Sequence, residues 1–191
     1  MSGLERRRFL VNLLAAIPAL RLSARGASLT STEPGALQEP AGGILVASGE
    51  DRFHATRAIG VSSTTFKVSA GDTRHSLFAM EHHSTIHGGP PLHVHREADE
   101  FWYVLAGEYV IEVGGQQFQA RGGDCVLGPR GVPHRWAFVG QSPGRLLITF
   151  TPAGRMEDFF GRPRTSNAYA DDPALYQRFG MELLGPPLPV K

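Results

Sequence analysis

Apolar and polar residues alternate in short runs along the middle of this chain, from about residue 60 to residue 151. An alternation with a period of two places one set of side chains on each face of a β-strand, and turn residues separate these runs. Many short, evenly spaced strands are typical of a sandwich or barrel. We therefore predict an all-β domain whose strands are Thr64–Val68, Ser76–His83, Pro91–His95, Glu100–Leu105, Glu108–Val113, Gln116–Ala120, Asp124–Leu127, His134–Val139 and Arg145–Thr151.

Two of these segments carry additional information. Gly114 and Gly115 lie between two predicted strands, and two glycines supply the positive φ angles of a two-residue type I′ hairpin. The segment Glu100–Leu105 is apolar on both faces. One face is expected to line the barrel interior, so a neighbouring sheet or a partner subunit must cover the other. We expect a homodimer.

The pattern changes after the last predicted strand. Residues Arg155–Phe160 read as a short helix. Asp172 and Pro173 are an N-cap residue and a first-turn proline, so they predict a second helix that runs to about Leu184. These short C-terminal helices are expected to cap the barrel mouth or to cover its outside.

The N-terminus differs from the rest of the chain. Arg6 and Arg7, followed by Phe9 and Leu10, match the R-R-x-F-L pattern of a twin-arginine export signal. The apolar run Val11–Leu20 is too short to span a bilayer. We predict an export signal over residues 1–27 and a folded protein in the periplasm or outside the cell. An amphipathic N-terminal helix is the competing interpretation.

Three regions follow from these patterns. Residues 28–52 are rich in Pro, Gly, Ser and Glu, as in a linker or an extended N-terminal arm. Residues 53–188 form the single predicted domain, including its helical tail. The chain has 191 residues and is 41% hydrophobic, which is enough for one core and leaves no room for a second barrel.

Charge and cysteine content exclude several classes of function. The chain has 19 basic and 18 acidic residues, so its net charge of +1 gives no field that would attract nucleic acid or, beyond export, a membrane surface. No P-loop, serine nucleophile elbow or dinucleotide fingerprint occurs. The single cysteine, Cys125, falls in a predicted strand, and we expect a buried, inert thiol.

Histidines and carboxylates supply the candidate chemistry. His93 and His95 lie two residues apart in a predicted strand, so both can project into one cavity. Glu97, Asp99 and Glu100 follow within five residues of His95, and His134 comes later, after a Gly/Pro-rich turn. Three imidazoles and one carboxylate suit one divalent transition metal: Fe, Mn, Ni, Co, Cu or Zn. Such a set leaves coordination positions open, as catalytic sites do.

Two segments resemble the conserved motifs of the cupin superfamily. Residues 88–107, GGPPLHVHREADEFWYVLAG, resemble the first motif, and residues 123–134, GDCVLGPRGVPH, resemble the second. Phe138 replaces the Asn that closes the second motif, a position that binds no metal in the family pattern. The resemblance implies a cupin fold, which is a double-stranded β-helix or jelly-roll barrel. It also selects Glu100 among the three carboxylates, so the implied metal ligands are His93, His95, Glu100 and His134.

The ends of the domain, residues 151–160 and 179–188, are similar to the tails of single-domain cupins grouped with quercetin 2,3-dioxygenases. This similarity implies a metal-dependent dioxygenase that cleaves a flavonol or another small enolic or phenolic substrate with O2, with Glu100 as the catalytic base. Two alternatives stay open. One is a non-redox metal-dependent isomerase, lyase or cyclase, and the other is a non-catalytic exported module that binds a small ligand.

Overall fold

The computed structural model describes residues 42–55, 57–59, 62–162 and 172–190 of the chain. These described residues all belong to one compact unit. The predicted export signal therefore lies outside the described residues. Within the part that is described, no helix combines the length and the apolar character needed to cross a membrane.

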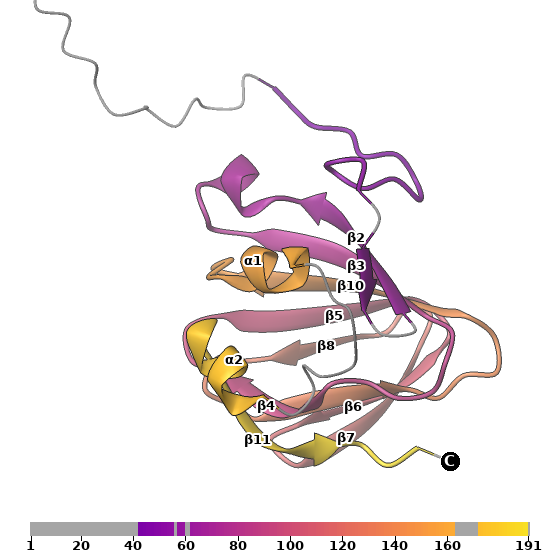
Figure 1. Cartoon of the computed structure of the whole chain (residues 1–191). Coiled ribbons are helices and arrows are strands. Elements are labelled where there is room, and N and C mark those ends of the chain that lie inside the picture. Colours follow the sequence, from indigo (N-terminus) through magenta and orange to yellow (C-terminus); the bar gives the residue numbers. More distant parts are fainter. Residues whose placement is uncertain (1–41, 56, 60–61, 163–171, 191) are drawn as a thin grey trace, which may run out of the picture. The chain divides into compact units, whose positions relative to one another are not determined.

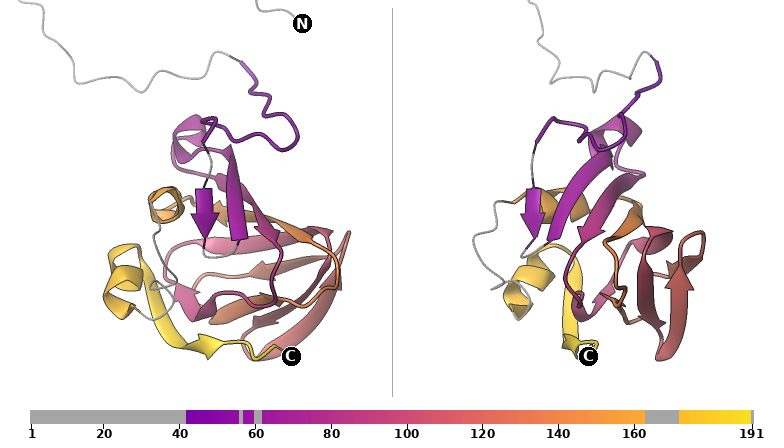
Figure 2. Two further views of the ribbon diagram at one scale, coloured as in Figure 1. Left: turned by 45° about the vertical axis from the view of Figure 1, so that its right-hand side comes forward. Right: turned by 90° about the vertical axis from the view of Figure 1, so that its right-hand side faces the viewer.

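Two antiparallel sheets face each other and form the domain (Figures 1 and 2). The first has the order β1-β2-β3-β10-β5-β8, and the second has the order β11-β4-β9-β6-β7. The all-β prediction is confirmed. The elements are β1 (Arg57–Ile59), β2 (Ser62–Val68), the 3-10 helix η1 (Ala70–Thr73), β3 (Phe78–Ser84), β4 (Pro91–His95), β5 (Asp99–Ala106), β6 (Glu108–Val113), β7 (Gln116–Arg121), β8 (Cys125–Gly128), β9 (His134–Phe138), β10 (Gly144–Thr151), α1 (Met156–Gly161), α2 (Pro173–Arg178) and β11 (Met181–Pro187).

The predicted strands agree with the observed ones to within two residues at each end. Both bounds of Pro91–His95 and Glu108–Val113 are correct, because turn residues border those runs closely. The hairpin at Gly114 and Gly115 is confirmed, since both residues have positive φ, 58° and 83°. Strands β1 and β11 were not predicted.

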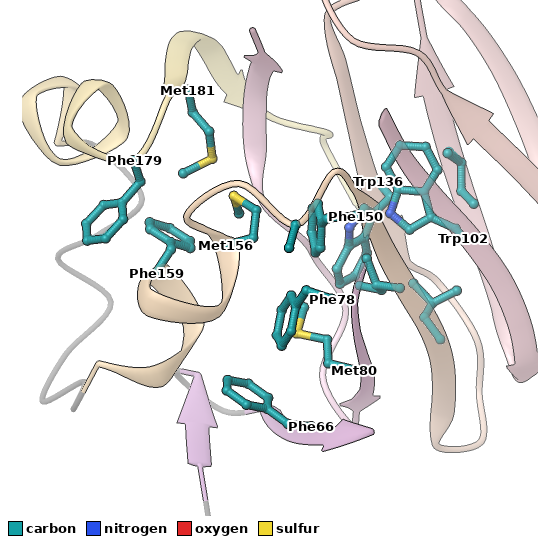
Figure 3. Packing of buried hydrophobic residues seen from close by; sticks show 14 of the residues in the cluster. Phe66, Phe78, Met80, Trp102, Trp136, Phe150, Met156, Phe159, Phe179 and Met181 are labelled. Atoms are coloured by element: carbon teal, nitrogen blue, oxygen red, sulfur yellow. The ribbon is translucent and has the colours of Figure 1, made fainter. Parts of the chain in front are cut away.

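Aromatic residues from both sheets fill the space between them (Figure 3). The Phe78 ring centroid lies 4.8 Å from that of Phe66 and 5.9 Å from that of Phe150. Trp102 from one sheet and Trp136 from the other belong to the same buried cluster. Each such ring buries a large apolar area, so this cluster supplies most of the driving force that holds the sheets together.

The second C-terminal helix is shorter than its N-terminal signals suggested. Asp172 caps it as predicted, because its Oδ1 accepts a hydrogen bond from the Leu175 N–H at 3.1 Å. The helix ends at Arg178, since Gly180 has a φ of 78° that breaks the helical path. The prediction of a helix to Leu184 was wrong: residues Met181–Pro187 form β11, which pairs with β4.

Cys125 is exposed, so the prediction of a buried thiol was also wrong. The pairing of β5 with β8 explains this result. Val126 lies opposite the buried Trp102, and Cys125 lies opposite Tyr103, which faces outward. Because neighbouring side chains on a strand point to opposite faces, a shift of one residue separates an inward thiol from an outward one.

The outer face of β5 and β8 is only partly covered in the single chain. Tyr103 is 38% exposed and Leu127 is 54% exposed, while Phe101, which lies opposite Leu127, is half-buried. The expectation that something else covers this strand pair is consistent with these exposed apolar side chains. The homodimer itself stays a prediction.

The end of the predicted arm is fixed to the domain. Asp51 is buried and accepts hydrogen bonds from the backbone N–H groups of Phe53 at 2.8 Å and Phe66 at 2.7 Å. It also pairs with the Arg57 guanidinium. The Arg52 guanidinium donates two hydrogen bonds of 3.0 Å to Asp72. Asp51 and Arg52 therefore pack as part of the domain.

Candidate metal centre

Four buried side chains from three strands converge inside the barrel. β4 supplies two histidines, β5 the carboxylate and β9 the third histidine, so both sheets contribute to the cluster. One ligand atom from each residue can be chosen so that all of them lie within 4.8 Å of one another. These residues are the predicted ligand set: His93, His95, Glu100 and His134.

Strand pairing brings the four together. His93 lies directly opposite His134 across β4 and β9. Glu100 lies opposite Gly128 on β8, and a side chain at Gly128 would collide with its neighbours. A Cβ atom there would come within 3.2 Å of His134 Nδ1 and 2.6 Å of the Trp102 ring. Because Gly128 has no side chain, it leaves the space that His134 and Trp102 occupy.

Backbone carbonyl groups select the tautomers of two histidines. His93 Nδ1 lies 2.8 Å from the carbonyl oxygen of Pro91, and His134 Nδ1 lies 2.9 Å from that of Val132. A carbonyl oxygen can only accept a hydrogen bond, so each Nδ1 carries the proton and donates it. Each Nε2 then presents a lone pair to the interior. This outer hydrogen bond is the arrangement that orients histidine ligands in metal sites.

The inward-facing nitrogen and oxygen atoms of His134 and Glu100 lack a proton with which to form a hydrogen bond. His134 Nε2 lies 3.1 Å from Glu100 Oε2, and His95 Nε2 lies 3.0 Å from the same oxygen. Despite this distance, His95 Nε2 is buried with no hydrogen-bond partner of acceptable geometry. Since the proton of a neutral His134 is on Nδ1, its Nε2 and the carboxylate are both acceptors. A cation between them would satisfy both, so this donor set fits a metal ion.

Protonation states also favour a cation. Burial, together with the neighbouring His95 and His134, lowers the pKa of His93 to about 3. Burial alone would raise the pKa of Glu100, but the neighbouring His134 and His95, whose Nε2 atoms lie 3.1 and 3.0 Å from its Oε2, outweigh that effect and lower it overall. At neutral pH His93 is therefore a neutral imidazole and Glu100 an anion. Metal ions bind these forms of the two side chains.

The other two carboxylates lie elsewhere. Glu97 is exposed, and Asp99 faces Arg130. The Arg130 guanidinium donates hydrogen bonds of 3.0 and 2.8 Å to Asp99 and, together with its backbone N–H, lowers the pKa of Asp99 to about 2. Of the three candidates, the structure brings only Glu100 to the histidines.

The remaining histidines do not join this cluster. His82 points inward, as its apolar companions on the strand suggested, and its ring lies 4.9 Å from that of Trp136. His83 faces the opposite side, near Glu81. His54 and His75 are exposed, and His87 is half-buried.

Three aromatic residues border the cluster without having been singled out as its neighbours: Trp102, Phe150 and Tyr176. The Trp102 ring lies 5.2 Å from His134, and its Nε1 is a buried donor without a partner. The Tyr176 ring, from α2, lies 5.7 Å from His93. The position of Trp102 follows from strand parity, because it lies two residues after Glu100. No sequence signal connects Tyr176 with His93, since 82 positions separate the two residues.

Comparisons with known proteins agree with this geometry. A model described as a cupin domain matches residues 82–150, a segment that contains all four clustered side chains. An uncharacterized protein of Methanocaldococcus jannaschii is 28% identical over 67 residues, which are 35% of this chain and 54% of that protein. The chain thus spans about half the length of the curated relative that it matches.

A solved structure shows the same fold. KdgF from Halomonas sp. superposes with a TM-score of 0.50 at 16% identity, over 58% of this chain and 94% of that one. An RmlC-like cupin from Shewanella frigidimarina is 27% identical, with a TM-score of 0.45, over 55% of this chain and 87% of that one. The domain therefore has the cupin jelly-roll fold, and the cupin-domain model matches one part of it, residues 82–150.

Proposed function

We propose that this protein is a metal-dependent dioxygenase of the quercetinase-like kind, which cleaves a flavonol or another small enolic or phenolic substrate with O2. The observation that carries the proposal is the set of inward-facing acceptors. His134 Nε2 and the Glu100 carboxylate meet in a buried space as two acceptors, and His95 Nε2 lies 3.0 Å from the same carboxylate oxygen. A site with four protein ligands keeps positions open for a substrate in an octahedral metal.

A divalent metal bound by His93, His95, Glu100 and His134 would supply Lewis acidity and a position for an ionised substrate oxygen. The protein's own groups supply the rest. In this proposal Glu100, which is buried beside the histidines, accepts the proton of a substrate hydroxyl group. The carbonyl groups of Pro91 and Val132 hold two imidazoles in place. Buried Trp102 and Phe150 keep bulk water away from the cluster.

Metal content decides between this proposal and its alternatives. The wild-type protein, purified without affinity metals, is analysed by mass spectrometry beside a variant with His93→Ala and His134→Ala. About one equivalent of Fe, Mn, Co, Ni or Cu that disappears in the variant, together with oxygen uptake on flavonols, supports the dioxygenase. Stoichiometric zinc and activity that is unchanged without oxygen would instead support an isomerase, lyase or cyclase. If the wild-type protein contains no metal that is lost in the variant, a non-catalytic binding module is the better account.

We also propose that the domain is exported in its folded state. The support is the Arg6-Arg7-Arg8-Phe9-Leu10 pattern at the N-terminus and the apolar run that follows. Replacing Arg6 and Arg7 with lysine should retain the protein inside the cell, because the export machinery reads the arginine pair. Cell fractionation followed by immunoblotting measures this. Equal export of both proteins would contradict the proposal.

A homodimer through the outer face of β5 and β8 is a third proposal. Its support is the exposed apolar pair Tyr103 and Leu127 on adjacent strands. Leu127→Glu should shift the protein toward the monomer in multi-angle light scattering, because it places a charge in an apolar contact. A monomeric wild-type protein would overturn this assembly.

A further inference from the structure

We propose that the C-terminal segment formed by α2 and β11 is a positioning element of the metal centre, and that Tyr176 is its positioning residue. The segment would hold β4, and with it His93 and His95, in the geometry that binds metal. This inference rests on the metal site proposed above. It predicts that metal binding and docking of this segment depend on each other.

The pairing of β4 is strongly asymmetric. On one side β4 has a single register pair with β9, His93 with His134. On the other side it pairs with β11 along its whole length (Figure 1). Met181 lies opposite His95, and Leu183 lies opposite His93. Most of the backbone hydrogen bonding that places the two histidines therefore comes from residues near the end of the chain.

Tyr176 contacts a histidine ligand directly. Its ring meets the His93 ring nearly at a right angle, at 70°, with 5.7 Å between centroids. Tyr176 is buried, and the Phe159 ring supports it from α1 at 5.9 Å. Figure 3 shows Phe159 beside Phe179, which follows α2 directly, and their ring centroids lie 5.5 Å apart. Because the His93 Nδ1 is held by Pro91, Tyr176 completes the packing that keeps this imidazole in one orientation.

Further contacts tie the segment to the residues beside the other two histidines. Arg96, next to His95, donates its backbone N–H to the Gly180 carbonyl oxygen at 3.1 Å and pairs with Glu182. Arg135, next to His134, donates from Nη1 to the Pro186 carbonyl oxygen at 2.9 Å.

Glu112 holds the Arg135 guanidinium through two hydrogen bonds of 3.1 Å, so the anchor for Pro186 is itself oriented. The C-terminal segment thus contacts a ligand or the neighbour of a ligand on both β4 and β9. If docking this segment improves the ligand geometry, metal must stabilise the docked segment by the same factor, because coupling between two binding events is reciprocal. Metal binding should therefore stabilise residues of the C-terminal segment that do not contact the metal.

The test compares variants of two adjacent buried residues on α2. Tyr176→Ala removes the contact with His93, whereas Leu175→Ala removes a similarly buried side chain from the neighbouring position. Tyr176→Phe keeps the ring. Zinc is titrated into each metal-free protein to obtain Kd, and thermal unfolding is measured on the same samples.

We expect Tyr176→Ala to weaken zinc binding by about 10- to 100-fold, the range typical of residues that orient metal ligands. Tyr176→Phe should restore most of the affinity, and Leu175→Ala should lower the melting temperature with little change in Kd. Hydrogen exchange should show that zinc protects the amides of residues 175–183 in the wild-type protein and protects them less in Tyr176→Ala.

Three outcomes would overturn the inference. Equal zinc affinity in the wild-type protein and Tyr176→Ala would show that the ring does not position His93. Equal loss in Tyr176→Ala and Leu175→Ala would reduce its role to general stability. If the wild-type protein itself binds no zinc at His93, His95, Glu100 and His134, the proposed metal site fails and the inference fails with it.

Discussion

Two buried polar clusters among the described residues of the barrel interior differ in whether their polar groups can satisfy one another's hydrogen bonds. The ligand cluster consists of His93, His95, Glu100 and His134. The hydroxyl cluster consists of His82, Ser84 and Tyr109. Phe150 of β10 lies opposite Glu100, and Gly144 lies opposite Ser84, so the clusters lie toward different ends of that strand.

Hydrogen-bond capacity separates the two clusters. In the hydroxyl cluster, Tyr109 donates to Ser84 Oγ at 3.2 Å, and Ser84 Oγ lies 3.1 Å from His82 Nδ1. A hydroxyl group both donates and accepts, so these groups can satisfy one another. In the ligand cluster, the inward-facing atoms of His134 and Glu100 are both acceptors. Burial of histidine therefore does not by itself indicate a metal site, whereas a surplus of acceptors does.

The largest expected effect comes from removing one histidine in each cluster. His134→Ala should weaken metal binding by about 100-fold or more, because four-ligand zinc sites gain roughly 10–16 kcal/mol in total. His82→Ala should leave the metal content unchanged. Mass spectrometry and zinc titration of both variants measure the difference. Equal metal loss in the two variants would mean that the clusters are not distinct.

Glu100→Gln should affect turnover and metal binding to different extents. The amide keeps one oxygen ligand but cannot accept the substrate proton, so turnover should fall by about 100-fold or more while metal binding falls less. Oxygen uptake at saturating flavonol, measured beside metal Kd, tests this. Parallel loss of both quantities would assign Glu100 to metal binding alone.

Acid should destabilise the metal-free protein through the ligand cluster. The pKa of His93 is about 3 in the folded state and about 6.5 in the unfolded chain. As the pH falls, His93 is therefore protonated in the unfolded chain before it is protonated in the folded protein. The stability due to neutral His93 is complete above about pH 6.5 and declines as pH falls toward 3. The lowered pKa of Glu100 acts in the same direction below its usual range.

Thermal unfolding between pH 4 and pH 8, in the presence of a chelator, should therefore be less pH-dependent in His93→Gln than in the wild-type protein. Tyr109→Phe is the matched control from the hydroxyl cluster. Burial raises the pKa of Tyr109 to about 12, so its phenol does not titrate in this range and the acid slope should be unchanged. An unaltered slope in His93→Gln would contradict the prediction.

The smallest expected effect concerns the hydroxyl cluster alone. Tyr109→Phe removes the hydrogen bond to Ser84 and should lower the free energy of unfolding by about 1 kcal/mol, the usual net value of one such bond. Metal Kd should stay at the wild-type value. Urea unfolding and zinc titration on the same preparation measure the two quantities. Weaker metal binding would show that the clusters communicate.

Local patterns were sufficient where structure depends on neighbours in the chain. Alternation placed β4 and β6, and the spacing of His93 and His95 on one strand put both on the same face. The sequence-based predictions failed where pairing with a distant strand determines the local structure. Cys125 faces outward because of its register against Tyr103, and Met181–Pro187 is a strand because β4 offers an edge to pair with.

By itself, the sequence determined the all-β architecture and the shared face of His93 and His95, because periodicity is a local property. The resemblance to the cupin motifs then selected Glu100 among the three carboxylates and completed the ligand set with His134. The tertiary structure alone decided that Tyr176 packs on His93 and that β11 completes the sheet beside β4. It also decided that His134 Nε2 and Glu100 meet as two acceptors. Each of these contacts joins residues far apart in the chain, and their proximity depends on how the two sheets pack.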